Sequence, residues 1–254
     1  MAKDNRCVVV VPIYAPAPSA DEVLALRSLQ LLGGRYPIVF AAPEGLPLAA
    51  YLRLVPGAKV QPFAPRHFAS VEAYSKLTAS PGFYLRFARY RYMLLVQTDA
   101  CLLHGNLEPW LQAGYSYLGA PWEQAAWLPG VQAYAQKRWG QPAGRLVPAV
   151  GNGGASLRRI GHFLRAWLWY AAHGPKEADW LAAHRQEDVF WTQVLAPALP
   201  FFTLPDAQTA ATFAMETQLP AEGQALPLVV HAVGKYNPAF WLPLVEAALA
   251  QPRP

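Results

Sequence analysis

The chain has 254 residues, of which 54% are hydrophobic and 15% are charged. This composition is typical of a folded globular protein with a rather apolar surface, and it excludes an intrinsically disordered chain. The net charge of +5 comes from 21 basic and 16 acidic residues without a run of like charges. Such a mild excess favours an anionic ligand and argues against nucleic acid as a partner.

The cysteines and the N-terminal residues indicate in which cellular compartment the protein is expected. Cys7 and Cys101 each lie in or beside an apolar run, so we interpret them as buried thiols in a reducing environment. The apolar run after Arg6 reaches a proline without a small-residue cleavage site, which argues against a signal peptide. No stretch approaches the roughly 20 apolar residues of a transmembrane helix. The sequence predicts a cytoplasmic protein and leaves peripheral membrane contact open.

The first elements in chain order predict an α/β fold. The run CVVVVPIYAP at 7–16 is typical of a strand buried on both faces. Residues 19–34 predict a helix with Ser19 or Asp21 as N-cap and a glycine pair as its stop. YPIVFAAP at 36–43 predicts a second buried strand. This alternation favours a mostly parallel sheet flanked by helices with right-handed crossovers.

The middle of the chain places an acid at a strand end. Two short helices broken at Pro81-Gly82 lead to a strand over Tyr92 to Gln97, and Asp99 follows. Ligands of open α/β sheets bind beyond the carboxyl ends of the strands, which would suit Asp99 to a ligand contact. An aspartate that only starts a loop is an equally good explanation.

The second half alternates irregular and helical patterns. Residues 118–148 are rich in Pro, Gly and Trp and show little periodicity, which is typical of a binding loop or of a long packed loop. Residues 159–174 and 185–199 predict helices. The run PLVVH predicts a strand that ends on His231, with Lys235 four residues later.

The stretch VGNGGASLRR at 150–159 packs three glycines around an asparagine. Glycine permits positive φ and close backbone approach, so the stretch could receive an anionic or hydroxylated ligand. The spacing matches neither the dinucleotide fingerprint nor a P-loop. A tight turn before a strand is as good an interpretation.

Glu187 and Asp188 form an acidic pair at the start of a predicted helix. Acids in a first turn stabilise the helix dipole, and one of the two could instead be a general base. Consecutive helical side chains diverge by about 100°, so the two are not expected to share one task. His231 could ligate a metal or serve only as a hydrogen-bonded structural residue, and Lys235 could contact phosphate.

Taken in order, these features resemble GT-A-fold glycosyltransferases, and the closest likeness is to a largely uncharacterised bacterial glycosyltransferase-like domain family. The likeness extends over almost the whole chain and is carried by VVVPIY, FYLRFARYRYMLLVQTDA, YLGAPW, VGNGGASLRR, QEDVFW and HAVGKYNPAFW. It implies a single GT-A-like, Rossmann-related domain over 1–254, with a donor half at about 1–117 and an acceptor half at about 118–254.

The resemblance implies transfer of a sugar from a nucleotide-diphosphate sugar, by default a UDP-sugar, to a hydroxyl of a glycan or glycoconjugate. Asp188 is then expected to be the base of an inverting reaction, with Glu187 orienting the acceptor or the loop. The residues expected to bind the donor are Tyr14, Gln97, Thr98, Asp99 and Lys235. The expected sugar and acceptor loop comprises Gly151, Asn152, Gly153, Gly154, Arg158 and Trp122, with Arg159 as a second anion partner.

The resemblance also implies a divalent cation, Mn²⁺ or Mg²⁺, held by Asp99 and His231. Asp99 matches the second acid of an Asp-x-Asp motif, but Gln97 replaces the first acid and leaves metal dependence open. A second departure is Ala155, where related sequences carry an aromatic residue.

Two other functions fit the same residues. A nucleotide-sugar or phosphate-ester hydrolase would use the same metal and base against water. A non-catalytic carbohydrate- or nucleotide-binding module would keep the fold without the chemistry. The span 118–148 is the predicted acceptor wall, because aromatic faces pack on sugar rings and amides bond to hydroxyls.

Overall fold

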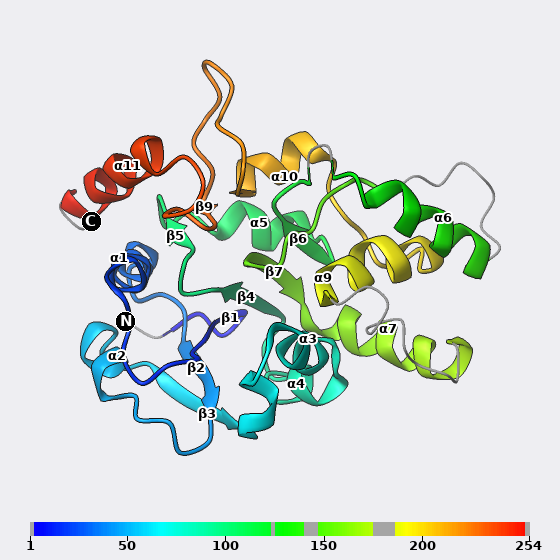
Figure 1. Cartoon of the computed structure of the whole chain (residues 1–254), viewed down its shortest axis with the longest axis horizontal. Helices are drawn as coiled ribbons and strands as arrows, with labels where there is room; N and C mark the ends of the chain where they lie inside the picture. The colour runs from blue at the N-terminus through cyan, green and yellow to red at the C-terminus, as the bar shows by residue number, and fades with distance from the viewer. Residues whose placement is uncertain (1–2, 123–124, 140–146, 175–185, 252–254) are drawn as a thin grey trace.

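The computed structural model describes residues 3–122, 125–139, 147–174 and 186–251, and in these ranges helices cover both faces of a central sheet (Figure 1). The elements follow in the order β1 Cys7–Pro12, α1 Ala20–Ser28, η1 Leu29–Leu32, β2 Ile38–Pro43, α2 Ala49–Leu54, β3 Lys59–Phe63, η2 Pro65–Phe68, α3 Val71–Ala79, α4 Pro81–Leu85, β4 Tyr92–Val96, β5 Cys101–Leu102, α5 Glu108–Ala113, β6 Tyr117–Gly119, α6 Leu128–Trp139, β7 Ala155–Arg159, α7 Ile160–His173, α9 Glu187–Val189, η3 Phe190–Leu195, η4 Ala196–Ala198, α10 Ala207–Phe213, β8 Ala214–Met215, β9 Val229–Val230 and α11 Pro238–Ala250.

The central sheet has six strands in the order β3-β2-β1-β4-β7-β6. Its strands pair in parallel from β3 to β4, whereas β7 runs antiparallel to both of its neighbours. Every residue of β1 is buried, as expected for a strand covered on both faces. The predicted mixed, mostly parallel sheet is therefore confirmed.

The first predicted helix forms for the expected reason. The Ser19 hydroxyl accepts a hydrogen bond from the Glu22 amide, and the Glu22 carboxylate accepts one from the Ser19 amide, so Ser19 is the N-cap of α1. The helical run ends at Gly33 with a φ of +61°, the left-handed conformation that favours glycine.

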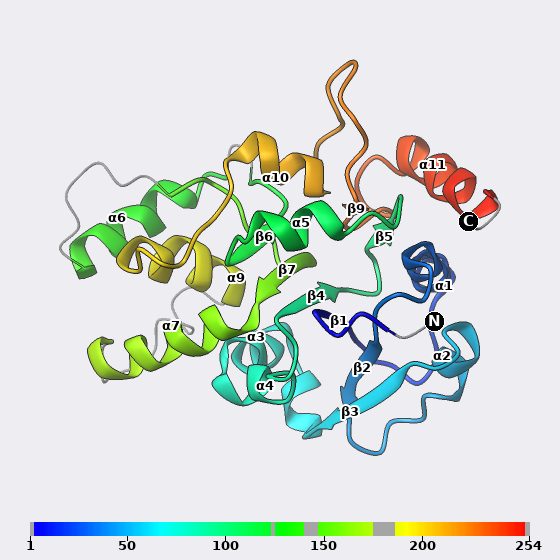
Figure 2. The same cartoon turned by 180° about the vertical axis from the view of Figure 1, so that it is seen from behind.

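Two apolar cores lie on opposite faces of the sheet. In Figure 1, α1, α2 and α5 lie on one side of the sheet, and α3, α4 and α7 lie on the other. Leu26 and Tyr51 belong to the first core, and Phe83 and Phe163 to the second. A small sheet of β5, β9 and β8 extends the molecule, and α11 packs beside α1, as seen from behind in Figure 2.

Some elements differ from the prediction. The span 118–148 contains the helix α6, which was not predicted. Only Val131 and Ala135 of this helix are buried, so its sequence lacks the apolar spacing that indicates a helix. Residues 123–124 and 140–146 of this span lie outside the described residues. The edge strand β3 was not expected, because Pro62 interrupts its pattern. The helix predicted at 185–199 begins at Glu187 and winds as a π-helix through η3. None of the described helices could serve as a membrane span.

Candidate active site

The predicted site residues converge where β4 ends and β7 begins. Because β7 is antiparallel to β4, Val96 pairs with Ala155, and the glycine loop before β7 lies beside the residues that follow β4. The Gln97 amide donates to the Gly154 carbonyl at 2.8 Å. Asp99 therefore comes to lie against the loop Gly151–Gly154 at the carboxyl edge of the sheet.

Close approach, rather than backbone conformation, explains most of these glycines. Gly151 alone in the loop has a positive φ, +128°, and a Cβ there would overlap Thr192. A Cβ at Gly153 would lie 3.1 Å from Asp188 Oδ2. A Cβ at Gly154 would overlap the His231 ring. Two consecutive glycines thus let an aspartate and a histidine approach the same backbone from different elements.

Asp99, Glu216 and His231 form a first charged group, here called the open cluster. His231 Nε2 lies 3.3 Å from Asp99 Oδ1, and Nδ1 lies 2.9 Å from Glu216 Oε1. His231 and Glu216 form an ion pair while the imidazole is protonated. The Asp99 side chain is 51% exposed, which leaves the cluster accessible to a ligand.

The carboxylates decide the charge of the open cluster. Burial opposes a positive imidazole, but Asp99 and Glu216 outweigh it and raise the pKa of His231 to about 9. Burial likewise opposes the negative charge of Asp99, yet His231 and then Lys235 lower its pKa below the usual value. At neutral pH the cluster therefore holds a protonated histidine between two carboxylates.

Glu216 is the member of this cluster that the sequence reasoning missed. It follows the two-residue strand β8, which is too short to be recognised in the sequence. The Asn152 amide donates to Glu216 Oε2 at 3.0 Å, and its carbonyl oxygen accepts from the Gly154 amide at 3.0 Å. Asn152, expected to contact a ligand, thus joins the glycine loop to the open cluster.

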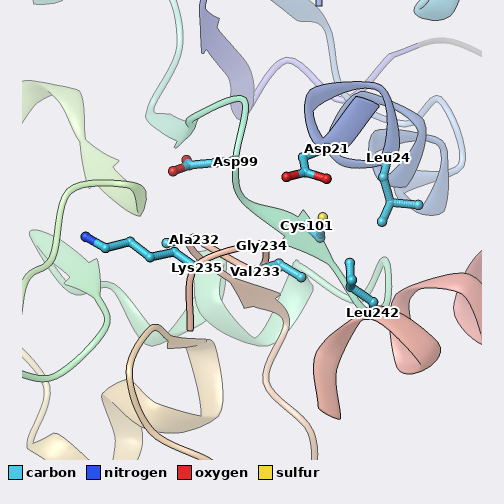
Figure 3. A pocket seen from close by; sticks show the side chains of 9 residues that line it. All are labelled: Asp21, Leu24, Asp99, Cys101, Ala232, Val233, Gly234, Lys235 and Leu242. Carbon is cyan, nitrogen blue, oxygen red and sulfur yellow. The ribbon is translucent and has the colours of Figure 1, made fainter. Parts of the chain in front are cut away.

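A pocket of about 300 Å³ lies beside the open cluster. Figure 3 shows Asp21 from α1, together with Asp99 and Lys235 from two other segments, on its walls. The Asp99 carboxylate and the Lys235 ammonium point away from the apolar side formed by leucines. The pocket has the size at which small-molecule sites begin.

Arg158 and Glu187 form a second charged group, here called the sealed pair. Arg158 Nη2 donates to Glu187 Oε1 at 2.7 Å, and the two side chains are 0% and 7% exposed. The remaining guanidinium donors reach the Tyr84 hydroxyl at 3.0 Å, the Tyr117 hydroxyl at 3.4 Å and Ser156 Oγ at 2.9 Å. Arg158 and Glu187, which were expected to face a ligand or an acceptor, are thus enclosed in protein.

Asp188 lies next to the sealed pair but is only partly buried. Its Oδ2 accepts from the Gly153 amide at 2.9 Å, and its Oδ1 accepts from the Val189 amide at 2.8 Å. Burial, followed by the negative charge of Glu187, raises the pKa of Asp188 to about 7. A carboxylate with such a pKa can take up a proton near neutral pH.

The other predicted residues lie around this centre. Tyr14 follows β1, is 42% exposed, and packs edge-on against Phe68 and Tyr74. The Thr98 hydroxyl donates to Glu22 at 2.6 Å, which fixes the end of β4 to α1. Arg159 lies at the far end of β7, where it donates to the Gly114 carbonyl. Trp122 is half-buried and follows the loop that pairs with residues 149–152.

Asp99 and His231 are the residues that fit a divalent cation. A carboxylate oxygen and an imidazole nitrogen converge there, and an acid on the other imidazole nitrogen is the usual way to orient a histidine ligand. Within the described part of the chain no group of three or more His, Cys, Asp or Glu side chains is arranged to hold a metal ion by itself. A cation at this place would need further ligands from a bound molecule, as Mg²⁺ often takes from phosphates.

Solved structures share this fold. An active-site mutant of LgtC superimposes with a TM-score of 0.53 at 14% identity, covering 97% of both chains. The bifunctional glycosyltransferase WbbM, in its apo structure, gives a TM-score of 0.54 at 11% identity over 98% of this chain and 50% of that chain. A complex of the galactosyltransferase LgtC with donor and acceptor sugar analogues gives 0.49 at 12% identity, covering 97% of this chain and 98% of that chain. The likeness to the first two structures shows that the chain has the GT-A-like fold of glycosyltransferases.

Residues 57–231 match the model of a family described as protein of unknown function, DUF5672. Because the match covers more than half of the sequence, the chain belongs to that family. No curated protein matches it. The matched range includes the end of β4, the glycine loop, the acidic pair and His231.

Proposed function

We propose that the chain is a glycosyltransferase that moves a sugar from a nucleotide-diphosphate sugar to a hydroxyl acceptor with inversion. The carrying observation is that consecutive glycines, Gly153 and Gly154, contact Asp188 on one side and His231 on the other. Asp188, which can accept a proton, and His231, which can carry positive charge, thus contact adjacent residues of one loop. The fold around them is shared with glycosyltransferases.

The proposed donor site is the open cluster with its neighbouring pocket. The leaving diphosphate gains negative charge in the transition state, and Lys235 and the protonated His231 supply positive charge at that end. Tyr14 and Gln97 follow the neighbouring strands β1 and β4, where they would contact the nucleotide, whereas Thr98 is buried and would act only through its hydrogen bond to Glu22. A UDP-sugar is the donor we expect to bind first.

Asp99 would hold a divalent cation, Mn²⁺ or Mg²⁺, if the enzyme uses one, and His231 would join it only after losing the Nε2 proton that faces Asp99. Such a cation supplies positive charge against the diphosphate oxygens. Gln97 stands where the first acid of an Asp-x-Asp motif would lie, so the protein offers one strand-end carboxylate in place of two. The positive charges of protonated His231 and of Lys235 could stabilise the leaving diphosphate in place of a metal ion.

Asp188 is the proposed base. The acceptor hydroxyl oxygen forms a bond to the anomeric carbon while the bond from that carbon to the diphosphate oxygen breaks, and the hydroxyl proton passes to the Asp188 carboxylate. The Gly153 amide holds Oδ2 at 2.9 Å, which fixes the direction of the carboxylate. Glu187 acts on this step only through its neighbour, because its own carboxylate is committed to Arg158.

The experiment is a screen of nucleotide sugars with and without carbohydrate acceptors, in Mn²⁺, in Mg²⁺ and in chelator. Acceptor-dependent release of the nucleoside diphosphate is expected. Acceptor-independent hydrolysis as the main reaction would favour a hydrolase that uses the same residues against water. Tight donor binding without turnover for any acceptor would favour a binding module that has kept the fold only.

A further inference from the structure

An exposed tryptophan stands at the start of α6. Trp127 is 40% exposed, and it is the one exposed tryptophan in the part of the chain that the structure describes. Single exposed apolar side chains are common on protein surfaces, so exposure alone assigns no role. The way in which this indole is held in place is more informative.

A second indole braces Trp127. The ring centroids of Trp122 and Trp127 are 5.2 Å apart at an interplanar angle of 76°, an edge-to-face pair. Trp122 itself packs against the core on the α7 side of the sheet, and its amide donates to the Ala149 carbonyl at 2.8 Å. An edge-to-face contact covers at most one face of one ring, and Trp127 is 40% exposed, so an indole face remains open to a ligand.

The tryptophan pair is attached to the glycine loop. Pro121 forms a bridge with Val150, and the amides of Gly151 and Asn152 donate to the Ala120 carbonyl at 3.0 and 3.1 Å. The segment that carries Trp122 therefore runs alongside the loop that contacts Asp188. A ligand at the Asp188 end of the loop and a ligand on the tryptophan pair would be neighbours.

Helix α6 is also fixed to the segment that follows Asp188. The Trp139 indole N–H donates to the Val194 carbonyl at 2.8 Å, and Gln132 Nε2 lies 3.4 Å from Gln193 Oε1. Both partners belong to η3, which follows directly on Asp188 and lies beside α6 in Figure 1. Trp127 and the proposed base thus rest on one packed framework.

We propose that Trp127, braced by Trp122, is a carbohydrate subsite that stacks on a sugar ring of the acceptor. This inference rests on the proposed function and names its acceptor class. The C–H groups on one face of a sugar ring suit the negative face of an indole, and stacking releases water from both apolar surfaces. The acceptor is therefore a saccharide of at least two sugar units, with one unit at Asp188 and a second on Trp127.

The test measures saccharide binding without a donor. Lactose, maltose and cellobiose are titrated separately into the full chain and followed by saturation-transfer NMR and by indole fluorescence. At least one should bind, and Trp127→Ala should weaken it about tenfold, which corresponds to roughly 1.4 kcal/mol. Trp127→Phe should retain part of the affinity. Phe240→Ala is the matched control, because Phe240 is also 40% exposed but lies on α11.

Two results would overturn the subsite: none of the three disaccharides binds the wild type, or Trp127→Ala binds them as well as the wild type does. Thermal unfolding of each variant establishes that the fold is intact. UDP binding is measured on the same samples, which separates the two claims. In the wild type, UDP binding without binding of any of the three disaccharides refutes the subsite alone. Saccharide binding retained without turnover of any nucleotide sugar refutes the transfer reaction alone.

Discussion

Two charged groups lie on either side of the glycine loop and differ in their access to solvent. The open cluster carries Asp99 with its side chain 51% exposed, whereas Arg158 and Glu187 of the sealed pair are 0% and 7% exposed. Both contain a cation and a carboxylate at ion-pair distance. Charges that remain exposed are available to a ligand, and charges that are sealed can only stabilise or position other parts of the protein.

The sealed pair is joined to the loop it supports. Arg158 Nε donates to Ser156 Oγ at 2.9 Å, and Ser156 Oγ lies 3.4 Å from the Gly153 carbonyl. Glu187 is covalently next to Asp188. We therefore interpret the pair as the part that fixes β7 to α9, and Asp188 with the open cluster as the part that performs chemistry.

The largest expected effect comes from breaking the sealed pair. Arg158→Met leaves the Glu187 carboxylate buried without its partner, so the free energy of unfolding should fall by about 3–5 kcal/mol in urea denaturation. Glu72→Gln, which removes the exposed pair with Lys76, should cost less than about 0.5 kcal/mol. Equal costs for the two variants would contradict the distinction between sealed and exposed charge.

A double replacement sharpens the same comparison. Arg158→Met combined with Glu187→Leu removes both buried charges at once, so stability should recover most of what the single variant loses. Activity should not recover fully, because Asp188 loses the neighbour whose charge raises its pKa. Stability that does not recover in the double variant would mean that the surrounding hydroxyls, rather than the ion pair, are decisive.

Asp188→Asn should abolish the base without disturbing the fold. The asparagine oxygen can still accept one of the two backbone amides that Asp188 holds, so the variant should stay folded, although the lost second hydrogen bond should lower its free energy of unfolding. Sugar transfer should fall by about 10²- to 10⁴-fold, the usual contribution of a general base. Glu222→Gln, at an exposed loop position, is the control and should transfer normally.

Gly154→Ala should damage the open cluster. The new Cβ would overlap the His231 ring and displace it from Asp99, so affinity for the nucleotide sugar should fall about tenfold. Gly161→Ala is the matched glycine control, because its Cβ would meet no atom within 4 Å. Unchanged donor affinity in Gly154→Ala, measured by calorimetry, would place the donor elsewhere.

The last expected effects depend on pH. With the pKa of Asp188 at about 7, kcat/KM should rise as pH increases through that value. The pKa of this group is higher in the folded than in the unfolded chain, so its contribution to stability should fall as pH rises from about 4 to 7, by at most about 1.4 kcal/mol per pH unit. Both trends should be absent in Asp188→Asn. A wild-type rate that is flat across this range would contradict the base assignment.

The strands could be predicted because their signals are local. A continuous apolar run becomes β1, and Ser19 with Glu22 forms the capping box of α1. The acid after β4 and the glycines before β7 meet because antiparallel pairing brings the end of one strand to the start of the other.

The contacts within the site could not be predicted, because they depend on side chains far apart in sequence. Arg158 is one of two consecutive arginines at the end of β7 and yet lies in the core, where Glu187 compensates its charge. Glu216 lies after a two-residue strand, too short to be recognised before the small sheet was known. Helix α6 buries so few residues that its amphipathic pattern is weak.

One measurement tests the central claim most directly. The reaction of a nucleotide sugar with a saccharide acceptor is followed by NMR for the wild type and for Asp188→Asn, with the anomeric configuration of the product read from its proton coupling. The account predicts acceptor-dependent transfer with inversion by the wild type and almost none by the variant. Retention of configuration, or undiminished transfer by Asp188→Asn, would contradict it.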